Sequence, residues 1–432
     1  MNARRIGIIS DHASPLASLG GVDSGGQNVY VASIASGLGK RGYEVDIFTR
    51  KDRQDLPSVI PYTRGCRIIN IKAGPEEQVA KEDLLPYMDE FSDRVADFCR
   101  DFGSYDIIHA NFFMSGLVAV KLNYVLGTPF VVTFHALGKI RRQFQKGADR
   151  FPEERFDIED RIVARAAGIV AECPQDRQDL IKQYAADPDK ISVIPCGFDP
   201  DEFHPVTAAT ARRVLGFEPD EKIVLQLGRM VERKGIDNVI RAFALMVRRR
   251  PSLLPSRLIV VGGETVDPDP VVTPEIGRLQ EIAASEGIAD KVVFKGQVGR
   301  GILKFFYNAA DVFVTTPWYE PFGITPVEAM ACGTPVIGSR VGGLKFTIRD
   351  GRTGFLVPAA NPEALEEKMA LVLSDGDLRE RLGINARKRA AGMFTWDRIV
   401  RQTISFYEKA LSMQDEQWVP ERKTVCKNSK EK

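Results

Sequence analysis

The chain has 432 residues, more than one ordinary hydrophobic core encloses, so we expect two domains. Apolar residues make up 44% and charged residues 27% of the sequence, which is typical of a globular protein in water. The 59 lysines and arginines balance 58 acidic residues, so no overall field predicts nucleic acid as a partner.

The cysteines and the short apolar runs narrow the class further. The six cysteines form no Cys-x-x-Cys pair, which argues against a metal or redox site and is typical of reduced thiols in the cytosol. No apolar run approaches the roughly 20 residues that span a bilayer. The first predicted strand begins too early to leave room for a signal peptide. We therefore expect a cytoplasmic protein without a transmembrane segment, whose oligomeric state stays open.

Short apolar strands alternate with helical patterns along the chain, which favours an α/β fold with parallel sheets. A segment at 197–220, rich in Asp, Pro, Gly and Ala, separates two series of strands. We predict Rossmann-like domains over 1–200 and 215–396, with ligands at the carboxyl ends of the strands. Strands are predicted at 5–10, 43–49, 106–109, 130–134, 168–171, 191–195, 222–228, 257–263, 291–295, 311–314 and 335–338.

Two helices frame these series. The first is predicted over 26–40, because Val31, Ile34 and Leu38 share one face and Gly42 lies beyond its end. The last is predicted over 397–413, and the polar segment 414–432 is expected to be disordered.

The glycine-rich loop Gly20-Gly-Val-Asp-Ser-Gly-Gly26 leads directly into the first helix. Glycines let backbone N–H groups approach a phosphate, and the helix dipole favours its charge. The spacing is not Gly-x-Gly-x-x-Gly, so a dinucleotide site is not indicated. A plain tight turn is the alternative interpretation.

Residues 318–332 carry the most information about function. Glu320 and Glu328 stand on either side of a Pro-Phe-Gly turn, between a strand and a helix that opens at Thr325-Pro326. Two carboxylates beside a helix N-terminus suit a ligand with both phosphates and hydroxyls, such as a nucleotide sugar. Thr325-x-x-Glu328 also fits a capping box, which would give Glu328 a structural role instead.

Basic and imidazole side chains end other strands. Arg229 and Lys234, in Gly228-Arg-Met-Val-Glu-Arg-Lys-Gly235, could supply the positive charge that a departing nucleoside diphosphate needs, or could be solvated. His135 ends the strand at 130–134, where a histidine is more often a packing residue, and His109 is a weaker candidate in a similar place.

In this order, the segments resemble the retaining GT-B glycosyltransferases of glycosyltransferase family 4, over nearly the whole chain. Segment 320–328 resembles the family's Glu-x-Phe-Gly-x-x-x-x-Glu signature. The resemblance implies two Rossmann-like domains facing a cleft, with the last helix crossing back to the N-terminal domain. The site residues that this segment would supply are Glu320, Phe322, Gly323 and Ile324 on the donor sugar and Glu328 on the nucleotide ribose.

Four further segments extend the resemblance. The loop at 21–31 resembles that of sucrose-phosphate synthases and D-inositol-3-phosphate glycosyltransferases, between donor diphosphate and acceptor. Segment 228–235 matches the family's diphosphate-binding element, and 132–139 resembles the segment whose histidine contacts the donor sugar. The base would meet mainly backbone near 296–298. The residues implied are Asp23, Gly25, Gly26, Gln27, Arg229, Lys234, His135 and Val298.

The acceptor is the least determined partner. Lys81, Lys139 and Arg155 match positions that hold the acceptor's phosphate in sucrose-phosphate synthases, but the basic run at 139–146 could instead be a solvated face or a patch touching anionic lipid. Ala136 and Phe112 depart from the hydroxyl residues expected at their positions.

The resemblance implies retaining transfer of a hexose, with UDP-glucose as the expected donor, to a phosphorylated sugar or polyol. The sequence does not indicate a metal, because no Asp-x-Asp follows a strand at a plausible donor site, and no tightly bound cofactor is expected. The other readings that remain open are a lipid-linked or polysaccharide acceptor at a membrane surface, a GT-B nucleotide-sugar epimerase and a non-catalytic binding protein.

Overall fold

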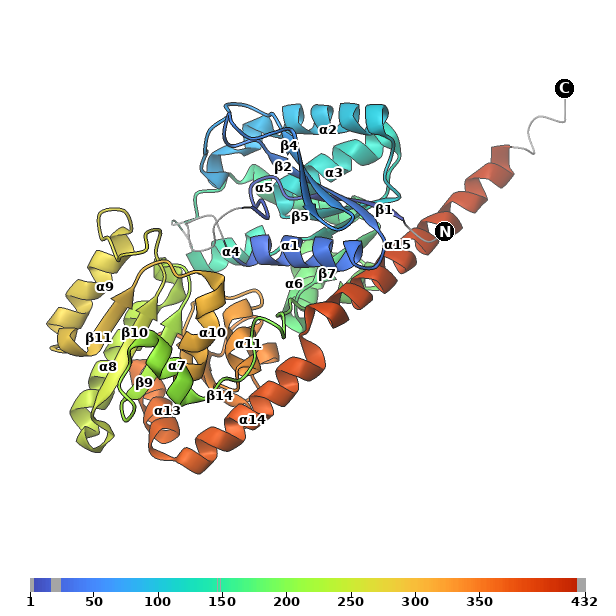
Figure 1. The fold of residues 1–432 in the computed structure, drawn as a ribbon. Coiled ribbons are helices and arrows are strands. Elements are labelled where there is room, and N and C mark those ends of the chain that lie inside the picture. Colours follow the sequence, from blue (N-terminus) through green and yellow to red (C-terminus); the bar gives the residue numbers. More distant parts are fainter. Residues whose placement is uncertain (1–3, 17–24, 146, 148, 426–432) are drawn as a thin grey trace, which may run out of the picture. The chain divides into compact units, whose positions relative to one another are not determined.

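The computed structural model divides into two compact units, each built on one sheet with helices on both faces (Figure 1). The structure describes residues 4–16, 25–145, 147 and 149–425, with side chains up to residue 413. Of these described residues, unit 1 comprises those within 4–16, 27–194 and 397–425, and unit 2 comprises those within 25–26 and 195–396. The predicted α/β fold with two parallel-sheet domains is confirmed.

The sheet of unit 1 has eight strands in the order β3-β4-β2-β1-β5-β6-β7-β8, and β3 alone runs antiparallel to its neighbour. The inner strands are buried on both faces, as the continuous apolar runs of parallel sheets require. Neither β3 nor β4 was predicted. β3 is a half-exposed edge strand that contains Pro61, whereas β4 lies inside the sheet and is largely buried. The strands are β1 Arg5–Ile9, β2 Glu44–Arg50, β3 Val59–Thr63, β4 Cys66–Ile71, β5 Ile107–Asn111, β6 Phe130–Thr133, β7 Gly168–Ala171 and β8 Ile191–Val193.

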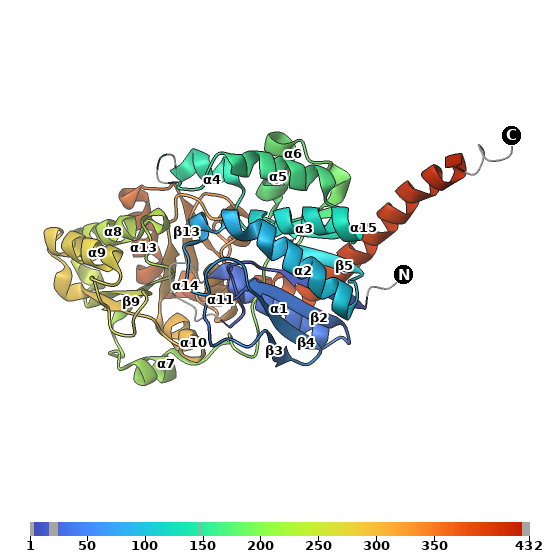
Figure 2. The ribbon, with the colours of Figure 1, turned by 90° about the horizontal axis from the view of Figure 1, so that it is seen from above.

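The helices of unit 1 cover both faces of this sheet. Helices α2 and α3 lie side by side over one face, and α1 covers the other (Figures 1 and 2). The chain changes face between β1 and β5, so these two strands form the topological switch point where ligands bind in such sheets. The helices are α1 Gly26–Gly39, α2 Met88–Phe102, α3 Phe113–Leu126, α4 Gly138–Gln145, α5 Glu154–Arg165 and α6 Pro174–Tyr184.

Unit 2 has a six-stranded parallel sheet in the order β11-β10-β9-β12-β13-β14, with its switch point between β9 and β12. Its core is a continuous cluster that includes Val239, Phe243 and Leu258. The strands are β9 Lys222–Leu227, β10 Ser256–Val261, β11 Val292–Lys295, β12 Val312–Thr315, β13 Val336–Ser339 and β14 Gly354–Val357. The helices are α7 Ala208–Leu215, α8 Ile236–Arg249, α9 Pro274–Ser285, α10 Arg300–Ala309, α11 Ile324–Ala331, α12 Leu344–Thr347, α13 Pro362–Ser374 and α14 Gly376–Met393.

The last helix, α15 Trp396–Val425, belongs to unit 1 from Asp397, and its Val400, Phe406 and Tyr407 are buried. A Cβ atom on Gly37 would lie 2.4 Å from Val400 Cγ2, so this close contact between α1 and α15 needs a glycine. The helix continues beyond the predicted end, where disorder was expected over 414–432, because Gln, Glu, Arg and Lys are polar but also good helix formers. The rest of that prediction, at 426–432, lies outside the described residues. Among the helices described, none combines the length and apolar composition needed to cross a membrane.

Candidate active site

The two motifs predicted in unit 2 meet at its topological switch point. The loop after β9 carries Lys234 and the loop after β12 carries Glu320, and β9 and β12 are neighbours in the sheet. Lys234 Nζ donates to Glu320 Oε2, across 86 residues of sequence. The main chains are joined as well, since Trp318 N donates to the carbonyl of Arg233 at 2.9 Å.

Positive charge exceeds negative charge at this strand end. Burial, assisted by Arg233 and Arg229, outweighs the attraction of Glu320 and lowers the pKa of Lys234 to about 8. Burial opposes ionisation of Glu320 too, but the charges of Lys234, Arg233 and Arg229 together keep the pKa of Glu320 below its ordinary value. The charges of Arg233 and Arg229 act in the same direction on both groups, since they lower the pKa of Lys234 and that of Glu320. An anion would relieve this excess.

The Pro-Phe-Gly turn after Glu320 is held by contacts that the sequence analysis did not find. Gly323 has φ of 90°, and a Cβ atom there would lie 3.0 Å from Leu344 Cδ2. Gly343 N donates to the carbonyl of Glu320 at 2.9 Å, and a Cβ atom on Gly342 would lie 2.1 Å from the same oxygen. The Gly-Gly pair at 342–343 was the available signal.

Glu328 is enclosed rather than capping its helix. Helix α11 begins at Ile324 without a side-chain cap, so the capping-box alternative does not hold. The Glu328 carboxylate accepts a hydrogen bond from the Tyr307 hydroxyl at 2.9 Å and lies 3.3 Å from Arg300 Nη1. Burial raises the pKa of Glu328 in spite of Arg300. Tyr307 and Arg300, both on α10, are the partners that sequence reasoning missed.

The remaining donor residues predicted in unit 2 lie at the same carboxyl edge. Phe322 is buried, with its ring centroid 5.7 Å from that of Phe394, and Ile324 is the first residue of α11. Val298 is half-buried in the turn between β11 and α10.

In unit 1, His135 follows β6 close to the β1/β5 switch point. Its Nδ1 lies 3.0 Å from Glu172 Oε1, and its Nε2 lies 3.0 Å from Asn111 Oδ1. Both ring nitrogens are therefore engaged within unit 1, which sequence reasoning did not anticipate. Gln27, on α1, donates from Nε2 to Ser10 Oγ at 3.2 Å and to the Asn111 carbonyl at 3.3 Å.

The rest of the predicted glycine loop is only partly described. Gly26 is the first residue of α1 and Gly25 immediately precedes it. Asp23 lies outside the described residues.

His109 has a structural role rather than a catalytic one. It is fully buried, with Nδ1 2.7 Å from the Tyr407 hydroxyl on α15 and Nε2 2.8 Å from Thr133 Oγ1. Burial, with a smaller contribution from His135, lowers the pKa of His109 to about 3, so the ring is neutral.

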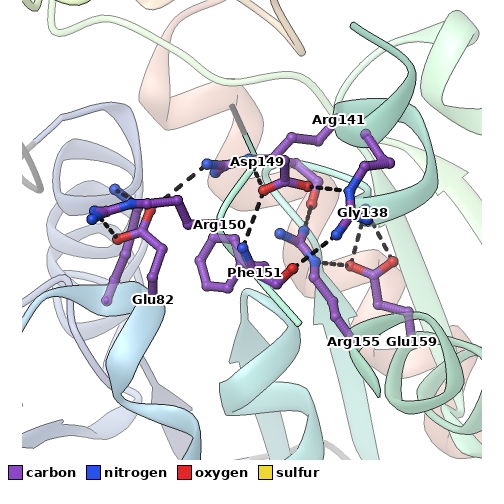
Figure 3. Close-up of polar contacts among 11 residues, drawn as sticks. Glu82, Gly138, Arg141, Asp149, Arg150, Phe151, Arg155 and Glu159 are labelled. Atoms are coloured by element: carbon purple, nitrogen blue, oxygen red, sulfur yellow. Dashed lines mark hydrogen bonds and ion pairs between the residues drawn. The ribbon is translucent and has the colours of Figure 1, made fainter. Parts of the chain in front are cut away.

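Arg155 does not lie at an open surface. Its Nε donates to Glu159 Oε1 at 2.7 Å, as Figure 3 shows. Its Nη2 donates to the carbonyl of Ala136. The guanidinium faces the rings of Phe112, Phe113 and Phe151 at 4.6–5.0 Å. An acceptor phosphate could reach this side chain only after aromatic rings moved away. Arg155 is therefore not part of the acceptor site that we propose.

The other two basic residues predicted for the acceptor have different surroundings. Lys139 Nζ contacts Asp160 Oδ1 at 2.6 Å and lies over the Tyr184 ring. Lys81 Nζ lies 3.8 Å from Glu82 Oε1.

Arg141, on α4, shares that Glu82 carboxylate at 3.7 Å and also contacts Asp149 at 3.0 Å (Figure 3). Its side chain is only 17% exposed, so this part of the basic run is not a solvated face. The structure thus associates Lys81 with Arg141 through Glu82, and places Lys139 among other partners.

Within the described part of the chain, no group of three His, Cys, Asp or Glu side chains could hold a metal ion. The structure has two parallel α/β units, each with charged side chains at its switch point. This arrangement is that of the GT-B glycosyltransferases.

Comparison with known proteins identifies the family. The model for Glycosyltransferase Family 4 matches residues 24–202, and that for Glycosyl transferases group 1 matches 208–389. A D-inositol 3-phosphate glycosyltransferase from Acidothermus cellulolyticus is 37% identical over 95% of this chain and 91% of its own length, and one from Actinosynnema mirum is 36% identical over 94% and 97%. The solved sucrose-phosphate synthase from Thermosynechococcus elongatus superposes with a TM-score of 0.87 at 33% identity, covering 95% of this chain and all of its own. The chain belongs to glycosyltransferase family 4 and is a hexosyltransferase.

Proposed function

We propose that this enzyme transfers a hexose, with UDP-glucose as the first candidate donor, to a phosphorylated sugar or polyol, with retention of the anomeric configuration. The names of the relatives support a phosphorylated substrate, since one group is named for D-inositol 3-phosphate and the other for the synthesis of sucrose phosphate.

The observation that carries the proposal is the excess of positive charge around Glu320. Within the described part of the chain, Lys234 pairs with Glu320, and Arg229 and Arg233 add positive charge that acts on Glu320, at the switch point of unit 2 where ligands of open α/β sheets bind. A leaving nucleoside diphosphate gains negative charge as its bond to the sugar breaks. Fixed cations stabilise that charge more in the transition state than in the bound donor, so they increase the rate of transfer.

The acceptor phosphate would be held by Lys81 and Arg141. Both side chains are partly buried, and both share the Glu82 carboxylate at long distances of 3.7–3.8 Å. A phosphate bound here would compete with Glu82, and with Asp149 for Arg141, and would form shorter, charge-assisted hydrogen bonds than the pairs with Glu82. In this scheme the acceptor hydroxyl attacks the sugar on the face that the nucleotide leaves, and the leaving phosphate oxygen takes the hydroxyl proton.

A direct test measures UDP release from UDP-glucose with a panel of acceptors. Fructose 6-phosphate, glucose 6-phosphate and inositol 3-phosphate are each paired with the unphosphorylated compound. We expect release with one phosphorylated acceptor and at least tenfold less with its partner. Equal rates with both members of the pair would overturn the phosphate requirement. Donor binding without release for any of them would favour a lipid-linked or polysaccharide acceptor.

Variants then separate the basic residues. Lys81→Ala and Arg141→Ala should each raise the acceptor KM at least tenfold and leave the donor KM within about twofold, as expected for loss of a charge-assisted phosphate contact. Lys139→Ala decides whether that residue contributes as well. Lys190→Ala is the matched control, because its ammonium contacts the carbonyl of Ala164 in the same unit. An acceptor KM unchanged in both Lys81→Ala and Arg141→Ala would contradict the assignment.

A further inference from the structure

Two neighbouring strand ends in unit 1 hold strained backbone. His135, after β6, has φ of 56°, and Phe112, after β5, has φ of 83° with ψ of 164°. Left-handed conformations are costly for side chains other than glycine and persist only where the surroundings hold them. Asn111 and His135 are bonded to each other across these two strands. The strain therefore indicates that the surroundings hold the backbone at His135 and Phe112 in a particular conformation.

The ring of His135 is the anchor of this segment. It is 10% exposed and lies between two oxygen atoms at 3.0 Å, one from Glu172 and one from Asn111. The Tyr30 ring packs against it edge to face, with centroids 4.9 Å apart. Further along the loop, the Ala136 carbonyl accepts from Arg155, and Gly138 N donates to Glu159 at 3.0 Å. The loop at 135–138 is thus held by side chains at both ends.

The orientation of Asn111 decides where the protons of His135 lie. Asn111 is 1% exposed, and its Nδ2 faces the carbonyl oxygens of Ile9 and His109 at 3.3 Å each. Turning the amide over would direct Oδ1 at two carbonyl oxygens without a donor, which is unfavourable in a buried site. Asn111 Oδ1 therefore faces His135, and His135 Nε2 must carry a proton to donate to it.

A second proton follows from Glu172. With Nε2 protonated, a neutral imidazole would turn the unprotonated Nδ1 toward the Glu172 oxygen at 3.0 Å, so a proton must lie between these two atoms. Among the described titratable groups, His109 and Asp176 do not compete for it. His109 is neutral, and burial followed by the charge of Glu172 raises the pKa of Asp176 well above its ordinary range. Glu172 is therefore the carboxylate that faces the His135 ring.

We propose that Glu172 is a positioning residue that keeps His135 doubly protonated and, together with Asn111, locks the strained loop at 135–138 into the conformation that the transfer reaction uses. The charge-assisted hydrogen bond to Glu172 and the hydrogen bond to the Asn111 side chain fix the His135 ring. The fixed ring in turn fixes the backbone of the loop at 135–138. The assignment of a role in transfer rests on the proposed function, whereas the protonation state of the ring does not.

The first experiment reads the ring directly. The full-length chain is labelled with ¹⁵N-histidine, and the signals of His135 among the four histidines are assigned by comparison with His135→Gln. At neutral pH we expect both ring nitrogens of His135 to be protonated in the wild type. In Glu172→Gln we expect a neutral ring with its proton on Nε2. A neutral ring in the wild type would overturn the proposal, whatever reaction the enzyme catalyses.

The second experiment separates positioning from simple stability. Glu172→Gln should lower kcat at least tenfold and change both KM values less than about threefold, while thermal unfolding stays cooperative. Added to His135→Gln, it should have no further effect on kcat, because it acts through the same ring. Asp189→Asn, an exposed residue in the turn Pro188–Lys190 of the same unit, is the matched control and should leave kcat unchanged. Wild-type kcat in Glu172→Gln, or additive effects in the double variant, would refute the positioning role.

Discussion

Titration of Lys234 should be visible in the pH dependence of the reaction. Its pKa of about 8 lies well below the ordinary value of 10.5, because burial and the neighbouring arginines outweigh Glu320. At pH 9 such a lysine keeps about a tenth of its charge, whereas an ordinary lysine would keep nearly all of it. If the cation stabilises the leaving diphosphate, kcat/KM for the donor should fall about tenfold between pH 7 and pH 9.

The assay follows initial rates of nucleotide release from pH 6.5 to 9.5 in buffers of constant ionic strength. Because kcat/KM reports the free enzyme, the bound diphosphate does not shift the midpoint of this profile. Lys234→Arg keeps a charge at all these values, so its profile should lose the alkaline fall, even if its absolute rate is lower. Lys222→Arg, at the opposite end of β9, is the control and should keep the wild-type profile.

Loss of the fold through this group does not explain such a fall. The unfolded lysine holds its proton up to about 10.5 and the folded one only up to about 8, so the unfolded state binds more protons in between. Stability from this group therefore rises with pH across that window. A flat profile up to pH 9.5, or an alkaline fall that survives in Lys234→Arg, would refute the reasoning.

Three further variants test other parts of the structure. Arg155→Met leaves Glu159 buried without its cation, so it should lower the unfolding free energy by about 3–5 kcal/mol. The acceptor KM of the folded protein should stay within about twofold of the wild-type value. A large rise in KM at unchanged stability would show that Arg155 binds the acceptor after all. Tyr407→Phe removes the partner of His109 Nδ1 and should cost about 1–3 kcal/mol in a denaturant titration, and an unchanged midpoint would contradict the assigned role of α15 as a support for unit 1. Gly323→Ala forces a Cβ atom into left-handed backbone beside Leu344, so calorimetry should show at least tenfold weaker donor binding by a folded protein, and wild-type affinity would disprove this account of the turn.

The sequence by itself determined the fold class and the approximate places of the site. Alternating apolar strands and helices predicted two parallel sheets, because period and burial are local properties of such patterns. The motifs around Lys234 and Glu320 were placed correctly at strand ends, and adjacent strands then brought them into contact. The strands β3, β4 and β14 escaped this reasoning. Exposure weakens the apolar signal of the edge strand β3, whereas β4 is an inner strand that was missed in spite of its apolar run.

Tertiary structure alone decided which polar side chains face each other. The sequence does not show that Arg155 is enclosed by three aromatic rings, that Tyr307 and Arg300 hold Glu328, or that Glu172 faces His135. Such pairs join residues from separate strands and helices, and their partners follow from packing rather than from spacing along the chain. A basic residue looks the same in a sequence whether its charge meets a buried carboxylate or a ligand, because burial and partner distance set its chemistry.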